Sequence, residues 1–386
     1  MCYLRGSTFF ILRGVFMAND TLQNAKNEKK VEFYTQLTDI EQELRHYKDQ
    51  LKDKIIFCNC DDPFESNFFK YFAMNFNFLG LKKLIATCYD NSPIAYTQFS
   101  FLGKDKKIPN TLRKAYKIEI NEVKDLNGDG AVDLADVEYL LKSDKNALTI
   151  LKGNGDFRSE ECIELLKECD IVVTNPPFSL FRDFITLLYK FDKKFLIIGN
   201  MNAITYKGVF KLIIDNKLWV GYGFNKTIKF RVPNFYEGHI ENGIKYGKVP
   251  AITWFTNLET EKRNEEIILY KKYSVNDYPK YITLDAIDVK EISDIPCDYF
   301  GIMGVPKTFL DKYNPKQFEI LGYEREDDNI TVGIQNMPES FLQKYREQGG
   351  RGHYTRGMKM LCYYENDGTA KIPFSRILIR RKQNEN

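Results

Sequence analysis

The residues best suited to chemistry stand together at the end of a short apolar run. Residues 171–174 (IVVT) have the character of a buried strand, and Asn175, Pro176, Pro177 and Phe178 follow directly. Such a match seldom arises by chance, because four specified positions must agree at the end of a strand. An exocyclic amine conjugated with a ring is a poor nucleophile, so a site that activates it must accept hydrogen bonds from both N–H groups. The side-chain oxygen of Asn175 and the carbonyl of Pro176 can accept them.

The proline pair and Phe178 complete this interpretation. Proline fixes φ and has no backbone N–H, so the Pro176 carbonyl is held in place without a competing donor. Phe178 can stack on a planar ring. The amine proton becomes acidic only after methyl transfer, so no strong general base is needed. The motif therefore indicates methyl transfer to a planar amine; the alternative is that a double proline merely ends a strand in a tight loop.

Strand-like and helix-like segments alternate around this motif. Helical spacing of apolar residues predicts helices within 32–51, where Thr38 or Asp39 could be the cap, and within 66–78, 159–169 and 180–191. Apolar runs predict strands at 54–61, 83–90, 147–151, 171–174 and 194–200, with a less regular stretch before residue 147. This alternation predicts parallel βαβ units and a doubly wound α/β sheet, with ligands at the carboxyl ends of the strands.

The alternation stops at a charged segment, residues 259–266, and shorter strands and turns rich in Gly, Asn and Asp follow. We therefore expect a catalytic domain at 19–258 and a smaller region at 259–386. Residues 1–18 are expected to be a disordered N-terminal extension, because Met17 opens a polar stretch and is a plausible start. The apolar patch in this extension is much shorter than a secretory signal or a membrane span.

Positive charge is concentrated near the C-terminus. The 386 residues have a formal net charge of +3, yet residues 340–386 carry ten Lys or Arg against four acids, so the remainder is net negative. A surface that binds a polyanion requires such a distribution. The eight cysteines form no C-x-x-C pair, so neither zinc nor a disulfide framework is expected, and a reducing cytoplasm is the expected location.

From about residue 32 to the C-terminus, the sequence resembles the EcoRI-type family of adenine-specific DNA methyltransferases. The resemblance rests on residues 33–35 (FYT), on the strand and turn at 57–69 and on residues 175–178 (NPPF). It implies a Rossmann-like S-adenosylmethionine-dependent methyltransferase fold with a C-terminal target-recognition region. It also implies methyl transfer to the N6 amine of an adenine flipped out of double-stranded DNA. The enzyme would serve a restriction–modification system, with a separately encoded cognate restriction endonuclease.

The resemblance assigns the cofactor site to three groups of residues. They are Phe33, Tyr34 and Thr35; Asp61, Asp62 and Pro63; and Asp90, Asp156 and Phe157. Asp90 would bind the ribose hydroxyls, and Asp156 with Phe157 would contact the adenine of S-adenosylmethionine. The turn at 57–69 departs from the glycine-rich loop usual in methyltransferases, so no backbone groups are assigned to the methionine part. For Asp90 and Asp156 the alternative is a solvated strand end or a helix cap.

The expected DNA contacts lie further along the chain. Trp254 and Phe255 resemble a motif that supplies an aromatic wall for the flipped base, and two core aromatics on a strand are the alternative. Residues 349–360 place basic and aromatic side chains among glycines, as a segment that follows a phosphate backbone or enters a groove would. The candidates are Arg351, His353, Tyr354, Arg356 and Lys359, with Arg380, Arg381 and Lys382 as further phosphate contacts or simply a solvated basic tail.

Residues 125–136 (DLNGDGAVDLAD) match the opening of an EF-hand calcium loop. The candidate ligands are Asp125, Asn127, Asp129, Asp133 and Asp136. Asp at the last position in place of the usual Glu is typical of dockerin-type loops, and the sequence holds one copy. At most a structural Ca²⁺ is expected here, and a surface turn built on Asn-Gly and Asp-Gly is the alternative.

The chemistry of the motif leaves other acceptors open. Asn-Pro-Pro-aromatic elements serve several planar amines and amides, so methylation of cytosine N4, of an RNA base or of a protein glutamine is the alternative among enzymes. A non-catalytic module that docks a partner through the calcium-type loop is a second alternative, and it would make residues 175–178 vestigial. The basic C-terminal region argues against a small substrate.

Overall fold

The structure is a computed structural model that describes residues 34–63, 66–89, 115–125, 136, 148–224, 226, 228–231, 238–241, 243–248, 251–325 and 332–383. The chain divides into two compact units: residues 1–201 with 226–258, and residues 202–225 with 259–386. Residues 202–225 thus belong to the second unit, although they precede the boundary expected at 259. No helix in the described part of the chain combines the length and the apolar character needed to cross a membrane.

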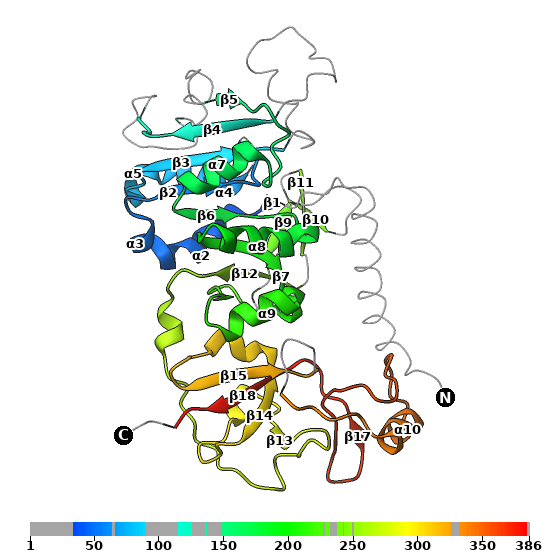
Figure 1. Ribbon diagram of the computed structural model, residues 1–386. Coiled ribbons are helices and arrows are strands. Elements are labelled where there is room, and N and C mark those ends of the chain that lie inside the picture. The colour runs from blue at the N-terminus through cyan, green and yellow to red at the C-terminus, as the bar shows by residue number, and fades with distance from the viewer. Residues whose placement is uncertain are drawn as a thin grey trace, which may run out of the picture. The chain divides into compact units, whose positions relative to one another are not determined.

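The first unit contains a sheet with the strand order β5-β4-β3-β2-β6-β7-β12 (Figure 1). Its strands are β2 (Ile55–Cys58), β3 (Lys83–Thr87), β4 (Tyr116–Ile120), β5 (Leu148–Ile150), β6 (Ile171–Thr174), β7 (Lys194–Asn200) and β12 (Ile252–Thr256). The neighbours β3, β2, β6 and β7 are parallel. This confirms the mostly parallel α/β sheet that the alternation of segments predicts.

Burial explains why these strands read as unbroken apolar runs. Every residue of β2 and of β6 is buried, as expected where helices cover both faces of a parallel sheet. Helix α7 (Glu160–Glu168) contacts β2, α8 (Phe181–Lys190) contacts β7, and α4 (Asn67–Met74) contacts β3. The core of this unit therefore lies between the sheet and its helices.

The outer strands of the sheet differ from the prediction. β4 is antiparallel to β3, β5 is antiparallel to β4, and β12 is antiparallel to β7. Residues 116–120, which form β4, lie in the stretch that the sequence leaves irregular. Their burial alternates between buried and half-buried positions, so they lack the continuous apolar signal that marks the central strands.

Serine residues begin two of the helices. The Ser66 hydroxyl accepts hydrogen bonds from the Phe68 and Phe69 amides at the start of α4, and the Ser159 hydroxyl accepts one from Cys162 at the start of α7. The first helix differs from the prediction, because it begins after Gln36 and neither Thr38 nor Asp39 caps it. Other helices in the described part of this unit are α2 (Leu37–Leu44), η1 (Arg45–Tyr47), α3 (Lys48–Leu51), α5 (Phe76–Leu79), η3 (Phe178–Leu180) and part of η4 (Met201–Thr205).

A small antiparallel sheet in the first unit has the order β1-β9-β11-β10. Its strands are β1 (Tyr34–Thr35), β9 (Lys229–Arg231), β10 (His239–Glu241) and β11 (Ile244–Lys248). Thr35 pairs with Phe230, and the Thr35 carbonyl accepts a hydrogen bond of 2.7 Å from the side-chain amide of Asn67 at the start of α4. The N-terminal strand is thereby held beside the start of α4.

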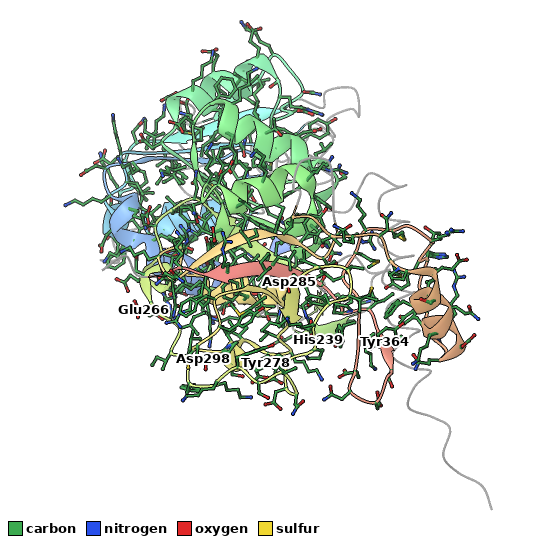
Figure 2. The ribbon with its side chains drawn as sticks, turned by 60° about the horizontal axis from the view of Figure 1, so that its bottom comes forward. His239, Glu266, Tyr278, Asp285, Asp298 and Tyr364 are labelled. Carbon is green, nitrogen blue, oxygen red and sulfur yellow. The ribbon has the colours of Figure 1, made fainter. Side chains whose placement is uncertain are left out.

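The second unit is built on a sheet with the order β13-β14-β18-β15. Its elements are α9 (Lys207–Ile214), β8 (Trp219–Val220), η5 (Glu261–Asn264), β13 (Ala286–Asp288), η6 (Ile292–Asp294), β14 (Ile302–Pro306), η7 (Lys307–Lys312), β15 (Phe318–Tyr323), α10 (Glu339–Glu347), β16 (Tyr363–Tyr364), β17 (Ala370–Lys371) and β18 (Arg376–Arg381). A buried ion pair of 2.8 Å joins Arg376 on β18 to Asp288 on β13. The Tyr278 hydroxyl donates to the Asp294 carbonyl at 2.8 Å, which ties the segment before β13 to η6 after it. Figure 2 labels Tyr278 among the side chains of this unit.

Candidate functional site

The ends of β2 and β6 lie next to each other. The two strands are parallel neighbours, and Ile56 and Phe57 pair with Ile171 and Val172. Residues 59–63 follow β2 and residues 175–178 follow β6. The topology therefore brings the Asn-Pro-Pro-Phe element to the turn that the sequence analysis assigned to the cofactor, at the sheet edge where α/β proteins bind ligands.

A chain of hydrogen bonds joins these two strand ends. The Cys60 amide donates to Thr174 Oγ1 at 3.2 Å, and the Thr174 hydroxyl donates to the Asp61 carboxylate. The second Asp61 oxygen accepts from the Ser66 hydroxyl at 2.7 Å. Asp61 is only 7% exposed, so its carboxylate acts as a buried clamp between the turn after β2, the start of α4 and the residue that precedes Asn175.

Asp62 and Pro63 are also built into the protein interior. Asp62 Oδ1 accepts a hydrogen bond of 3.0 Å from the Tyr116 hydroxyl on β4. Burial raises the pKa of the Tyr116 hydroxyl well above its usual value, as do Cys88 and Asp62, so it remains protonated and donates. Both Asp62 and Pro63 are buried. The sequence predicted that Asp61, Asp62 and Pro63 contact the cofactor, and the structure gives the two acids contacts that hold the turn.

The residues of the motif differ in their access to solvent. Pro176 is buried, Asn175 and Phe178 are half-buried, and Pro177 is exposed. The Leu180 amide donates to the Pro177 carbonyl at 2.9 Å, which closes the short helix η3 before α8 begins. The four residues thus form a short bridge from the buried strand β6 to helix α8. Asn175 and Phe178 are partly accessible to solvent, and the Oδ1 atom of Asn175 is itself buried.

The loop that carries Asp156 packs tightly against the end of β3. Gly155 has φ of +74°, and a Cβ atom there would overlap the carbonyl oxygen of Cys88. Asp156 receives two hydrogen bonds from the Arg158 guanidinium, at 2.9 and 2.7 Å. These hydrogen bonds hold the pKa of the Asp156 carboxyl below its usual value. The carboxylate is therefore ionised and oriented, and it already has a cationic partner.

Three predicted aromatic contacts are packed as core residues. Phe157 is 4% exposed and meets Phe184 edge to face, with ring centroids 5.1 Å apart. Trp254 is 1% exposed against Phe68, and Phe255 has no exposed surface. For Trp254 and Phe255 this burial agrees with the alternative of two core aromatics on a strand, here β12.

Three buried polar side chains mark the same edge of the sheet. Thr35 Oγ1, Thr253 Oγ1 and both polar atoms of the Asn59 side chain are buried and have no hydrogen-bond partner within the described part of the chain. Asn59 follows β2, Thr253 lies opposite Gly199 near the end of β7, and Thr35 is held beside the start of α4. Buried polar groups are normally paired, so unmet donors and acceptors at a ligand-binding edge fit a small polar ligand. Sequence reasoning missed Asn59, because nothing in its spacing distinguishes it.

Several predicted site residues fall outside the described residues. These are Phe33, Asp90, Asn127, Asp129 and Asp133, and the side chain of Tyr34. Of the calcium-type loop, Asp125 and Asp136 are described; Asp125 is exposed and Asp136 has no exposed surface. Across the described residues, no group of three or more His, Cys, Asp or Glu side chains is placed to hold a metal ion.

The basic residues predicted to contact DNA lie in two places in the second unit. Arg351, His353, Arg356 and Lys359 are exposed in the loop that follows α10, where Gly349, Gly352 and Gly357 have positive φ. The loop is held by Arg346, which donates to the Tyr354 carbonyl at 2.9 Å. Arg380 and Arg381 lie instead at the end of β18. Arg380 pairs with Glu319 at 2.5 Å, and Arg381 donates to the Cys297 carbonyl.

The known proteins to which this chain is similar are methyltransferases. A family profile described as "Adenine-specific methyltransferase EcoRI" matches residues 21–382. The type II methyltransferase M.EcoRI of Escherichia coli is 44% identical over 82% of this chain and 93% of its own length. The type II methyltransferase M.MpnI of Mycoplasma pneumoniae is 39% identical over 77% of this chain and 83% of its own length. No solved structure matches the chain.

Proposed function

The chain belongs to the EcoRI family of adenine-specific methyltransferases, and on this basis we propose a role for each part of the site. The family match covers nearly the whole chain, and the relatives are named type II methyltransferases. The protein is therefore an adenine-specific DNA methyltransferase of the restriction–modification type. S-adenosylmethionine is the methyl donor that the family implies.

The cofactor is proposed to lie at the carboxyl edge of the first unit's sheet. When bound, it supplies a methyl group carried on a positively charged sulfur. Its amino-acid and ribose parts present both donors and acceptors, and Thr35 and Asn59 offer unmet hydrogen-bonding atoms in buried positions there, where such bonds are strong. The polar side chains at this edge therefore fit the cofactor.

Asp156 is proposed to bind the adenine end of the cofactor. Its carboxylate is ionised, and Arg158 fixes its orientation. Removal of this acceptor in Asp156→Ala should weaken S-adenosylmethionine binding in calorimetry, while the fold is retained because the carboxylate is on a surface loop. An unchanged affinity would place the cofactor elsewhere.

Asn175 and Pro176 are proposed to accept hydrogen bonds from the two N–H groups of the target amine, and Phe178 to stack on the flipped base. Accepting both hydrogen bonds pulls the nitrogen toward a tetrahedral geometry and frees its lone pair for the methyl group. The observation that carries this proposal is the hydrogen-bond chain from Asp61 through Thr174. It fixes the residue before Asn175, so the acceptor atoms are held in place before the substrate arrives.

The reaction product tests this function directly. The protein is incubated with cofactor labelled in its methyl group and with unmodified plasmid DNA, and the DNA is digested to nucleosides. We expect N6-methyladenine alone. N4-methylcytosine would contradict the choice of base and leave the chemistry of Asn175 intact, whereas label found only in RNA or protein would refute the DNA substrate.

Residues 259–386 are proposed to be the target-recognition region, with the loop 349–359 as its principal DNA contact. A catalytic site that acts on one flipped base leaves sequence reading to other parts of the protein. The exposed Arg351, Arg356 and Lys359 side chains suit a phosphate backbone or a groove. A cognate restriction endonuclease is proposed as the functional counterpart. DNA fully methylated by this protein should resist an endonuclease that cuts the same recognition sequence.

A structural Ca²⁺ in residues 125–136 is a separate and minor proposal. It is supported by the spacing of Asp125, Asn127 and Asp129 around a Gly turn. If the ion binds, calcium should raise the melting temperature with little effect on turnover, because a ligand that binds only the folded state stabilises it. A melting curve that is the same in calcium and in EDTA would favour the plain turn.

A further inference from the structure

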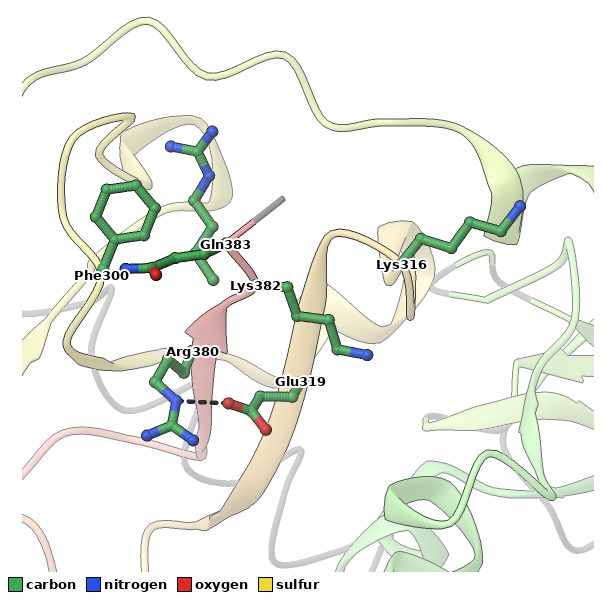
Figure 3. A pocket seen from close by; sticks show the side chains of 7 residues that line it. Phe300, Lys316, Glu319, Arg380, Lys382 and Gln383 are labelled. Atoms are coloured by element: carbon green, nitrogen blue, oxygen red, sulfur yellow. Dashed lines mark hydrogen bonds and ion pairs between the residues drawn. The ribbon is translucent and has the colours of Figure 1, made fainter. Parts of the chain in front are cut away.

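The second unit has a pocket at the end of β18, around the basic residues that the sequence predicts to be either phosphate contacts or a solvated tail. Its volume is about 860 Å³, and it is lined by Phe300, Lys316, Glu319 and residues 380–383 (Figure 3). The lining comes from three separated parts of the chain: the loop before β14, the start of β15 and the end of β18. None of the residues proposed above for methyl transfer lines it.

The charge of the pocket is strongly positive. Four of its side chains are cationic, and Glu319 is its single acid. Glu319 pairs with Arg380 at 2.5 Å, so this carboxylate is already neutralised. Within the described residues, neither Lys316 nor Lys382 takes part in an ion pair. Two ammonium groups therefore remain available to an anion from outside.

The pocket also presents a flat apolar ring beside a fixed cation. Phe300 is 42% exposed, and the Arg381 guanidinium lies 5.2 Å from the centre of its ring. Arg381 also donates to the Cys297 carbonyl, which fixes its position. Figure 3 shows Phe300 and Lys316 on opposite sides of the pocket. The cations are thus spread along the walls and do not converge on one point.

We propose that this pocket binds the phosphodiester backbone of the DNA substrate, at a place separate from the loop 349–359. A spread row of cations suits a chain of phosphates better than a single small anion, and an exposed ring provides apolar contact for a deoxyribose. Such contacts position a duplex and carry no sequence information. This inference rests on the proposed function, because it assumes DNA as the substrate.

The test is the salt dependence of DNA binding by the full chain. Lys316→Gln with Lys382→Gln removes the two available charges. Lys272→Gln with Lys371→Gln is the matched control, because both are exposed lysines of the same unit outside the pocket. Each neutralised phosphate adds about 0.9 to the slope of log K against log salt. We expect the double variant to lose about 1.8 from this slope on non-specific duplex DNA, and the control to keep the wild-type slope.

Methylation of plasmid DNA separates this inference from the proposed function. With saturating DNA at low salt, the double variant should still produce N6-methyladenine, because the chemistry lies elsewhere. A wild-type salt slope in the double variant, together with normal methylation, would contradict DNA binding by the pocket and leave the proposed function unaffected. The pocket would also be overturned if the variant loses binding to polyglutamate and keeps its affinity for DNA, since the surface would then serve an acidic protein. Absence of methylated DNA from the wild-type protein would instead refute the function.

Discussion

The carboxyl edge of the catalytic sheet and the basic loop 349–359 both carry polar side chains, but the two regions hold them in opposite ways. At the sheet edge, Asp61 is 7% exposed and accepts hydrogen bonds from two other elements. In the loop, the Arg356 side chain is 80% exposed, and its ion pair with Glu339 spans 3.3 Å at the surface. An exposed pair of this kind contributes little to stability.

Because the two regions differ in burial, we expect substitutions in them to have different consequences. We expect a change at the sheet edge to alter the fold, because its hydrogen bonds hold the strand ends, and to alter the reaction through the proposed role of Asn175. A change in the loop alters what the surface can bind and leaves the fold almost untouched. A protein arranged in this way can diverge in DNA contacts while its chemistry stays constant.

The largest expected effect is on turnover. Asn175→Ala should lower the rate of methyl transfer by about 100- to 1,000-fold, the range seen when one hydrogen bond to a reacting group is removed. Cofactor and DNA should still bind, because the interaction acts mainly in the transition state. Single-turnover kinetics with labelled cofactor measures the change. Ser179→Ala is the control, because Ser179 is an exposed neighbour in η3, and this variant should have normal turnover. Near-normal turnover of the Asn175→Ala variant would contradict the assignment of Asn175 to the active site.

The next effect is on stability. Asp61→Ala leaves the Ser66 and Thr174 hydroxyls without their buried acceptor, and we expect the free energy of unfolding to fall by about 3 kcal/mol, because hydrogen bonds to charged groups are strong. Denaturant unfolding measures it. Asp183→Ala, whose side chain is 61% exposed, should change stability by no more than about 0.5 kcal/mol. Equal effects of the two substitutions would show that Asp61 does not clamp the strand ends.

Substitutions in the loop 349–359 should alter DNA binding and leave stability nearly unchanged. Replacing Arg351, Arg356 and Lys359 by glutamine should leave the melting temperature nearly unchanged, because their side chains are exposed. DNA binding should weaken, and the slope of log K against log salt should fall by about 0.9 for each phosphate that is no longer neutralised. Fluorescence anisotropy over a range of salt measures both. A salt-independent affinity of the wild-type protein would mean that this charge is only a solvated surface.

The smallest expected effect concerns Asn59, which lies at the same edge of the sheet as Asp61. Asn59→Leu removes a buried amide that has no partner in the described residues, so the free protein should become more stable by about 1 kcal/mol. S-adenosylmethionine should bind about 10-fold more weakly, which corresponds to about 1.4 kcal/mol. Asn77→Leu is the control, because Asn77 donates to the Val123 carbonyl at 2.8 Å and removal of this donor should destabilise the protein. A less stable Asn59→Leu with unchanged cofactor affinity would contradict the role given to Asn59.

The sequence predicts the central part of the catalytic sheet well for a physical reason. Strands buried on both faces, such as residues 55–58 and 171–174, need continuous apolar runs. Serine is a preferred N-cap residue, so Ser66 and Ser159 indicate where two helices begin. The antiparallel edges could not be predicted in this way. A half-buried strand such as residues 116–120 gives a weak pattern, and the direction of a strand depends on its partner.

The candidate site was predictable where types and spacing are unusual, as at residues 175–178. Contacts between distant segments were not, because one sequence does not tell which acid meets which hydroxyl. Asp61 was predicted to contact the cofactor, and its hydrogen bonds to Thr174 and Ser66 could not be predicted from the sequence. The membership of residues 202–225 in the second unit was missed for the same reason, since it depends on packing and not on local composition.

Gly155 sets a limit on how this protein can vary by mutation. Every other amino acid has a Cβ atom, and at this position the atom would overlap the Cys88 carbonyl oxygen, in a backbone conformation that favours glycine. No amino-acid replacement at residue 155 is therefore neutral. In a library that samples all substitutions along the chain, this position should tolerate glycine only. Because Asp156 follows directly, we expect such a replacement to disturb both the folded loop and the residue proposed to bind the cofactor.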